Sequence, residues 1–249
     1  MKISIVTAVL NREDTVSQTI ESVQAQTYSD IEHIIQDGGS TDNTLKIVHS
    51  LADDRTKIVS APDTGIYDAL NKGIARSTGD IIGLLHSDDF LTCETIIEKV
   101  ARAFADPDVD GVYGDLDYIS PKDENRIIRH WKSGQFSKER LDKGWMPPHP
   151  TVYLRREVFE RFGDYDTSYK ISADYDAMLR YLGKNGVRMH YIPEVFVKMR
   201  IGGTSNKSLR NIIRKSREDY KALKTNQIGG LATLFMKNAS KLSQLISRD

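Results

Sequence analysis

The first 113 residues alternate short apolar segments with amphipathic ones, and this alternation limits the possible folds more than any other feature of the chain. Apolar runs typical of buried strands occur at 3–9, 31–36, 57–60, 81–85 and 109–113. Between them lie segments with helical spacing of apolar residues, at 14–26, at 42–51 with Thr41 as N-cap, around 69–74 and at 92–104. Strands that alternate with helices are joined by right-handed crossovers and form a mostly parallel sheet. We therefore predict an α/β fold, a Rossmann-like sheet flanked by helices.

The composition of the 249-residue chain excludes several functional classes. Lys+Arg and Asp+Glu both number 35, and this zero net charge argues against nucleic-acid binding, which requires a basic surface. Cys93 is the single cysteine, so no internal disulfide can form and we expect a cytoplasmic protein. No apolar run approaches the roughly 18 residues of a membrane-spanning helix, and the N-terminus lacks the pattern of a signal peptide.

Two adjacent carboxylates, Asp88 and Asp89, follow the apolar run 81–85. Like charges repel, and burial at the end of a strand raises the cost further. A hard divalent cation removes both problems because it prefers oxygen ligands, and it can also neutralise substrate phosphates. Asp37 follows another strand, and ligands of parallel sheets bind beyond the carboxyl ends of the strands. A metal site is therefore expected here, with capping of a helix near Thr92 as the alternative.

The loop after the first strand lacks the phosphate-binding motifs of two common nucleotide folds. It reads Thr-Ala-Val-Leu-Asn-Arg at 7–12, with neither G-x-x-x-x-G-K-[ST] nor G-x-G-x-x-G. A P-loop enzyme and a standard dinucleotide-binding protein are therefore excluded. The phosphates of a bound nucleotide would depend on a cation.

The second half of the chain has a different character. Residues 115–119 and 126–131 are predicted to be two strands around the turn 120–125. A rigid, aromatic and proline-rich loop follows at 145–150.

A helix is predicted over 173–184, with Ser172 as its N-cap. Asp176 precedes Arg180 by one turn, and a surface salt bridge explains it adequately. Asp174 has no such local partner. Either it interacts favourably with the positive helix N-terminus or it takes part in catalysis, and the residues alone leave both readings open.

In their order along the chain, these motifs resemble those of the family 2 glycosyltransferases, nucleotide-sugar enzymes of the fold called GT-A. The resemblance implies a GT-A catalytic domain at 1–205, with a nucleotide-sugar half (1–114) and an acceptor half (115–205), followed by a C-terminal helical extension (206–249). The matching stretches are 3–12, 24–42, 64–73, 86–89, 149–151 and 173–176.

The resemblance also implies roles for single residues. Asp174 matches the family's catalytic base, and an inverting displacement does need a carboxylate opposite the leaving diphosphate. Asp89, with Asp88, matches the binding site of a cation, Mn²⁺ or Mg²⁺, which stabilises charge on the leaving phosphate. His149 and Arg200 would lie on the acceptor side. The donor-binding positions, with the nucleoside at Asp37, are Thr7, Ala8, Asn11, Asp37, Asp68, Asn71, Ser87 and Asp88.

Some positions depart from the family's pattern. Many relatives have a second acid where this chain has Gly38, an aromatic residue where it has Leu10, and an arginine where it has Leu70. These changes leave the base of the nucleotide open. For His149 a polar filler role stays an alternative, and for 200–205, which resembles a flexible lid, the alternative is an ordinary glycine turn.

We therefore predict an inverting, metal-assisted glycosyltransferase of the hexosyl- or N-acetylhexosaminyl-transferase type. It would move one sugar from a nucleoside-diphosphate donor, expected to be a UDP-sugar, to a glycan or lipid-linked glycan in bacterial-type polysaccharide or glycoconjugate synthesis. Processive relatives carry a Gln-x-x-Arg-Trp motif and membrane-spanning helices, which this sequence lacks. The alternatives are a sugar nucleotidyltransferase, which should show a Gly-rich, Arg-containing first loop, and a non-catalytic sugar-binding protein, which would not need Asp88-Asp89 together with Asp174.

The C-terminal residues 208–249 carry separate information. A basic segment at 208–224 precedes an amphipathic helix at 231–246, with Lys237 expected off the apolar side. Such a pair can lie on an anionic membrane, at the inner face in this case. It can equally dock on the catalytic domain or form a homodimer, because helices of this kind usually complete a core.

Overall fold

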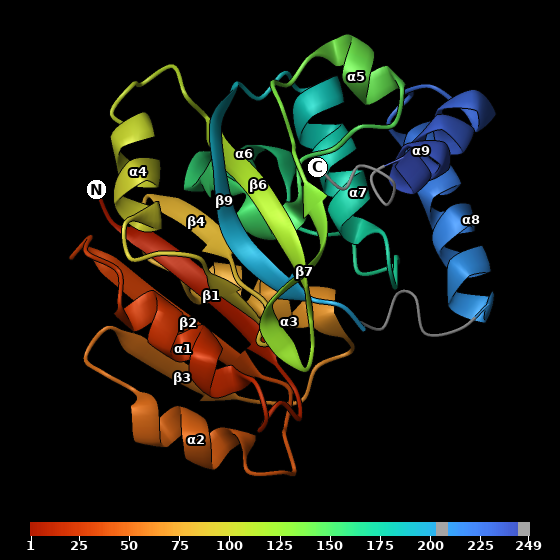
Figure 1. The fold of residues 1–249 in the computed structure, drawn as a ribbon. Helices are drawn as coiled ribbons and strands as arrows, with labels where there is room; N and C mark the ends of the chain where they lie inside the picture. The colour runs from red at the N-terminus through yellow and green to blue at the C-terminus, as the bar shows by residue number, and fades with distance from the viewer. Residues whose placement is uncertain (203–208, 244–249) are drawn as a thin grey trace.

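The computed structural model describes residues 1–202 and 209–243, and its central sheet carries helices on both faces (Figure 1). The strands are β1 (Ile3–Val9), β2 (Ile31–Asp37), β3 (Thr56–Ser60), β4 (Ile81–Leu84), β5 (Asp89–Leu91), β6 (Gly111–Ser120), β7 (Asp123–Trp131), β8 (Tyr153–Arg155) and β9 (Met189–Arg200). The helices are α1 (Val16–Gln24), α2 (Thr44–Leu51), α3 (Ile66–Arg76), α4 (Ile96–Ala103), α5 (Lys138–Asp142), the 3₁₀ turn η1 (His149–Thr151), α6 (Arg156–Phe162), α7 (Ala173–Met178), its π-helical continuation η2 (Leu179–Lys184), α8 (Leu209–Thr225) and α9 (Leu231–Ser243).

Within the described ranges, the strands pair in the order β3-β2-β1-β4-β8-β6-β9-β5, and β7 pairs with β6. β1 runs parallel to β2 and β4, and β2 runs parallel to β3. Val9 pairs with Asp37 and Asp37 pairs with Ser60, so these strands end at one edge of the sheet. The predicted α/β fold with a mostly parallel sheet is confirmed.

Strands β1, β2 and β4 are buried on both faces, which explains why most of their residues are apolar, whereas the edge strand β3 is partly exposed. Val6 and Ile34 belong to a core shared with α3, α6 and α7. Ile5 packs on the opposite face with α4, and Ile35 packs there with α1 and α2. The strand side chains thus alternate between two helical layers.

The second half contains more sheet than the sequence indicated. The strands expected at 109–113 and 115–119 form one strand, β6, which continues through a shift in its register against β9. Gly114 lies at this shift, and a Cβ there would come within 2.5 Å of the Phe196 ring, so glycine allows the strands to approach. β5 and β8, which were not predicted, are three residues long, too short to show a hydrophobic pattern.

The helix expected from Thr92 begins instead at Ile96, because the chain first forms β5 and then turns. Neither acid at 88–89 therefore caps this helix, and the capping alternative for that pair is wrong.

Of the two predicted N-caps, the one at Thr41 is wrong and the one at Ser172 is in place. Thr41 does not cap α2, which begins at Thr44, where the amide donates to Asp42 Oδ1 at 3.0 Å. Ser172 is the N-cap residue of α7, as predicted, although its side chain makes no capping hydrogen bond. The amides of residues 170–172 donate instead to the Glu218 carboxylate of α8, with 2.8 Å between Ile171 N and Oε2.

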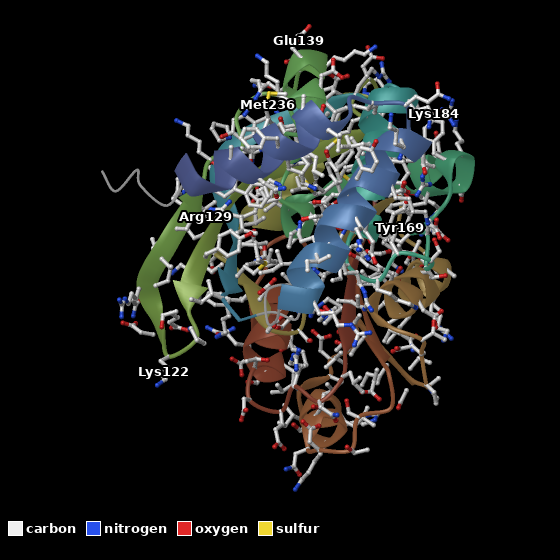
Figure 2. The ribbon with its side chains drawn as sticks, turned by 90° about the vertical axis from the view of Figure 1, so that its right-hand side faces the viewer. Lys122, Arg129, Glu139, Tyr169, Lys184 and Met236 are labelled. Carbon is white, nitrogen blue, oxygen red and sulfur yellow. The ribbon has the colours of Figure 1, made fainter. Side chains whose placement is uncertain are left out.

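Helices α8 and α9 pack against α7 and the loop before it, on the side that faces the viewer in Figure 2. Asn226 Nδ2 donates to Asp176 Oδ1 at 2.8 Å, and the Lys221 ammonium lies 4.2 Å from the centre of the Tyr169 ring. Asp176 is buried and its pair with Arg180 is long, at 3.7 Å, so this is not the surface salt bridge that was expected. The sequence left three partners open for this segment: a membrane, the catalytic domain or a second subunit. In the described residues, α8 and α9 contact the catalytic domain. No helix in the described ranges is long and apolar enough to cross a membrane.

Helix α9 docks with a face that the sequence did not indicate. Lys237 is buried, 2.9 Å from the carboxylate of buried Asp219 and 3.0 Å from the centre of the Tyr175 ring. Leu231 and Phe235, expected on the docked side, are 69% and 75% exposed. Lys237 therefore belongs to the interface, and an apolar edge of α9 faces outward.

We expect Asp219→Asn to lower the free energy of unfolding by about 3–5 kcal/mol, because it leaves a buried ammonium beside a neutral group. Burial raises the pKa of Asp219, but Lys237 and Lys215 outweigh it and hold this pKa below its usual value. The pair therefore stabilises the fold above roughly pH 4 and less as the pH falls further. Urea denaturation measures both effects. The control Glu98→Gln breaks the exposed pair with Arg102 and should cost under about 0.5 kcal/mol; equal losses would contradict the prediction.

Candidate functional site

The loops that follow β1 and β2 are joined by hydrogen bonds at the carboxyl edge of the sheet. Asn11 N donates to Ser40 Oγ, and Thr41 N donates to Asn11 Oδ1, both at 2.9 Å. Asn11 has a φ of 51°, a left-handed conformation that asparagine tolerates better than most residues. The side chain of Asn11, an expected donor-binding residue, therefore stabilises the conformation of this edge.

The buried carboxylate of Asp37 is bonded by its own loop and by the end of β3. Oδ2 accepts from Gly39 N at 2.9 Å and from Ser60 Oγ at 2.6 Å, and Oδ1 accepts from Ser40 Oγ at 2.5 Å. These bonds satisfy the charge and hold the loop 38–42 in place. The side chain faces the loop, so a direct contact with a nucleoside has no support in this geometry.

Three further expected donor positions lie inside the protein. Thr7 Oγ1 is 2.9 Å from His33 Nε2 between β1 and β2, and Ala8 is buried in the core. Ser87 is buried as well, and its carbonyl accepts from Thr15 Oγ1 at 2.9 Å. The side chains of Thr7 and Ala8 are thus used inside the protein, and Ser87 contributes to the edge through its carbonyl group.

The two expected donor positions on α3 make local contacts. Asp68 Oδ2 accepts from Thr64 N at 2.8 Å and from Lys72 Nζ at 3.0 Å, which fixes the start of the helix. Asn71 bonds both the carbonyl and the amide of Tyr165, at 2.8 and 3.1 Å. Asn71 thereby ties α3 to the segment that leads to α7.

The acidic pair lies where β5 meets β9. Arg200 donates to the carbonyl oxygen of Asp88 at 2.7 Å, and Arg12 Nε lies 4.0 Å from Asp88 Oδ2. Arg200 was expected on the acceptor side, and it lies beside the acidic pair. The remainder of the expected lid, from residue 203, falls outside the described residues.

Asp89 has an unusual environment for a carboxylate. It is fully buried, and neither oxygen has a hydrogen-bond partner of standard geometry in the described part of the chain. Burial, and next the charge of Asp88, raise the pKa of Asp89 well above its usual value, which the amide and charge of Arg200 only partly offset. A buried carboxylate of this kind is costly unless a positive charge compensates it. Its oxygens therefore fit a hard cation, although no group of three or more His, Cys, Asp and Glu side chains in the described ranges forms a complete metal site.

Asp174 lies at the start of α7, half-buried, and it has a neighbour that the sequence did not reveal. The Tyr67 hydroxyl is 3.2 Å from Asp174 Oδ1 and donates to the carbonyl of Ile171 at 2.6 Å. Burial, and next the charge of Asp174, raise the pKa of Tyr67 well above its usual value, so Tyr67 stays protonated. This hydroxyl holds the loop and the carboxylate together.

Two histidines, buried His149 and half-buried His86, are close enough to the acidic pair and Asp174 to feel their charge. The rings of His86 and His149 are 6.0 Å apart, and His149 Nε2 is 2.8 Å from the Tyr165 hydroxyl. Burial lowers the pKa of His149 to about 4, although the charge of Asp174 opposes this. Burial also lowers the pKa of His86, against the charges of Asp88 and Asp174. Both rings are therefore neutral at pH 7.

Tyr118 connects the two ends of this arrangement. Its ring stacks on Trp131 at 6.3 Å, and burial raises the pKa of its hydroxyl to about 12. Arg129 opposes that shift, whereas the charges of Asp89 and Asp174 both add to it. The charges of Asp89 and Asp174 therefore both raise the pKa of the same hydroxyl.

Three residues that shape this site were not predicted from the sequence. Tyr67 was within the stretch 64–73 that matches the family, so a signal existed for it. Tyr118 and Glu218 had none, since strand pairing and helix docking bring them to the site.

Comparison with known proteins identifies the family and the fold. The model of the family described as glycosyl transferase family 2 matches residues 4–163. A PGL/p-HBAD biosynthesis glycosyltransferase of Mycobacterium bovis is 31% identical over 212 residues, which cover 82% of this chain and 78% of that protein.

Two solved structures share the fold. One is S. aureus TarS 1–349 in complex with UDP-GlcNAc, with a TM-score of 0.70, 17% identity, and coverage of 91% of this chain and 65% of that one. This chain thus spans slightly less than two thirds of that structure. The other is the mannosyltransferase PcManGT of Pyrobaculum calidifontis in complex with GDP-Man and Mn²⁺, with a TM-score of 0.68, 18% identity, and coverage of 100% and 76%.

We expect Asp89→Asn to stabilise the metal-free protein by on the order of 1–3 kcal/mol. The folded pKa of Asp89 lies above the unfolded one, so its ionisation costs folding free energy at neutral pH, and the gain should shrink towards about pH 4. Chemical denaturation in EDTA measures this. Mn²⁺ should then stabilise the wild type and not the variant. Asp88→Asn, at a half-exposed position, should give a smaller gain, and a destabilised Asp89→Asn protein would contradict the prediction.

Proposed function

Since this chain belongs to glycosyl transferase family 2 and is a glycosyltransferase of the GT-A fold, we propose that it moves one sugar from a nucleoside-diphosphate donor to a glycan or lipid-linked glycan, with inversion at the anomeric carbon. The observation that carries this proposal is the buried, unpartnered carboxylate of Asp89 at one end of a site that has Asp174 at the other. One end suits a cation and a diphosphate, and the other suits a proton acceptor.

At the donor end, Asp89 with Asp88 would hold Mn²⁺ or Mg²⁺. The cation, when bound, supplies positive charge to the leaving diphosphate. Arg12 and Arg200, beside Asp88, would add charge for the same phosphates. A UDP-sugar is the expected donor, and the two structural neighbours in complex with UDP-GlcNAc and with GDP-Man support a nucleotide-sugar.

At the acceptor end, Asp174 would accept the proton of the attacking hydroxyl. Tyr67 fixes the loop before this carboxylate and keeps its own proton, so it does not compete as a base. His149 is neutral and buried beside Tyr165, which suits hydrogen bonding to a sugar hydroxyl better than binding of an anion. A single in-line displacement follows from one base facing one leaving group.

We also propose that α8 and α9 bring the enzyme to the cytoplasmic face of a membrane, where a lipid-linked acceptor would be found. Basic residues on α8, among them Arg210, Arg214 and Arg217, would attract anionic headgroups. Exposed apolar side chains on the same two helices are Ile212, Ile213, Leu231, Phe235 and Met236, the last of which is labelled in Figure 2.

We expect Asp174→Asn to lower kcat by about 10²-fold or more, because the shape is kept while the proton acceptor is lost. Affinity for the donor should change little, since the acidic pair is separate from this residue. Steady-state kinetics and calorimetry measure the two effects, and NMR of the product from the wild type should show an anomeric configuration opposite to that of the donor.

Asp176→Asn is the matched control on the same helix. Its carboxylate bonds Asn226 and Arg180 away from the site, so stability should fall while kcat changes little. A retained anomeric configuration, or normal turnover by Asp174→Asn, would refute the mechanism.

We expect the wild type to bind vesicles that contain phosphatidylglycerol and to bind pure phosphatidylcholine vesicles weakly. Phe235→Ser should reduce this binding by about 10-fold, because one large apolar contact is lost. Ile127→Ser, at an exposed position of β7, serves as the control and should have no effect. If Phe235→Ser instead converts a dimer to a monomer without changing vesicle binding, this surface joins two subunits and the membrane proposal fails.

A further inference from the structure

Residue 38 has no room for a side chain, because the carboxylate of Asp63 fills that space. A Cβ on Gly38 would lie 2.3 Å from Asp63 Oδ2 and 3.6 Å from Leu10 Cδ1. Gly38 is not among the residues with a positive φ, so the glycine is required for space and not for its backbone conformation. The chain therefore brings a carboxylate from the end of β3 over the end of β2.

The position of Asp63 is fixed. Asp63 Oδ1 accepts from Gly65 N at 2.8 Å, and Ala61 N donates to the carbonyl of Asp37 at 2.9 Å, which ties this segment to β2. No hydrogen bond from the described residues to Asp63 Oδ2 is seen, in contrast to Oδ1, and the side chain is partly exposed. An acceptor atom is thus held at the edge of the sheet with its hydrogen-bonding capacity unused.

An apolar side chain lies beside this acceptor. Leu10 is 48% exposed although it follows a buried strand, and its Cδ1 faces Gly38. The hydrogen bonds of Asn11 to Ser40 and Thr41 hold the backbone that presents it. Leu10, Gly38 and Asp63 together offer an apolar surface with a carboxylate at its margin.

The order of the strands relates this group to the rest of the site. The acidic pair follows β4, and the sheet continues from β4 through β1 and β2 to β3. A nucleotide whose diphosphate lies near Asp89 extends its nucleoside along this edge, towards Leu10, Gly38 and Asp63. We propose, on the basis of the proposed function, that Asp63 binds the edge of the donor's base and restricts it to uracil or guanine.

The restriction follows from hydrogen-bond chemistry. An ionised carboxylate only accepts hydrogen bonds, so it needs an N–H on the base. Uracil offers N3–H, and guanine offers N1–H together with its amino group. Cytosine and adenine offer an amino group on this edge, but their ring nitrogens N3 and N1 are acceptors and would repel a carboxylate that is placed to bind a ring N–H. A site with one charged acceptor therefore discriminates by repulsion as well as by attraction.

Calorimetry of the full chain with UDP, GDP, CDP and ADP, each with Mn²⁺, tests the proposal. The wild type should bind UDP or GDP at least about 10-fold more tightly than CDP and ADP, as expected for a hydrogen bond to a charged group. Asp63→Asn keeps an oxygen for Gly65 N and gains an amide donor. It should weaken the preferred nucleotide by about 10-fold or more and reduce or reverse the preference over CDP.

Two further variants make the outcome decisive. Asp30→Asn, an exposed acid at the opposite edge of the sheet, should leave all four affinities unchanged. Gly38→Ala displaces the Asp63 carboxylate and should reduce the base preference as Asp63→Asn does. If folded Asp63→Asn keeps the wild-type order of affinities, the inference is overturned while the proposed function stands. If the wild type binds none of the four nucleotides, both fail.

Discussion

Burial of the Asp89 carboxylate costs folding free energy, and the surrounding structure holds the residue in place despite this cost. It opens β5, a strand of three residues that pairs with β9, and its carbonyl accepts from Thr19 Oγ1 at 2.7 Å, so the residue cannot turn towards solvent. The guanidinium of Arg200 approaches from β9 but bonds the neighbouring carbonyl of Asp88. Folding thus leaves a carboxyl group without a hydrogen-bond partner of standard geometry at the sheet edge, and burial disfavours its ionisation. Such a group persists in a fold when a ligand supplies the missing positive charge.

Helix α7, which carries Asp174, is held in place by the C-terminal extension. Glu218 of α8 accepts the amides of the loop before α7, and Asn226 bonds Asp176 within α7. The element that carries Asp174 is therefore held by hydrogen bonds from beyond residue 205. The extension beyond the stretches that match the family contributes Ala222, Leu223 and Ile228 to the buried core of the domain, in agreement with the docking alternative.

The parallel half of the fold was predictable because its information is local. Each of its strands is rich in apolar residues, and polar residues follow the strands, so Asp37 and Asp89 could be assigned to one edge from spacing alone. The other half depends on contacts between distant residues. β5 and β8 are too short to carry a pattern, and Tyr67 meets Asp174 across 107 residues of sequence. Lys237 shows the same limit, because burial of a lysine depends on Asp219 and Tyr175, which no periodicity indicates.

The carboxylates at the sheet edge divide into two kinds, and the difference decides how a motif should be interpreted. Asp37 belongs to the more recognisable run of residues, yet its oxygens are satisfied by Gly39, Ser40 and Ser60, so it keeps the loop in shape when no ligand is present. Asp89 and Asp63 are less satisfied, and an external partner gains most from groups whose hydrogen bonds are unmet. A family motif locates the site, whereas unmet hydrogen-bonding capacity indicates which atoms in it are left for the substrate. Gly38 departs from the family's pattern, and the absence of a side chain at this position leaves the space that the Asp63 carboxylate occupies.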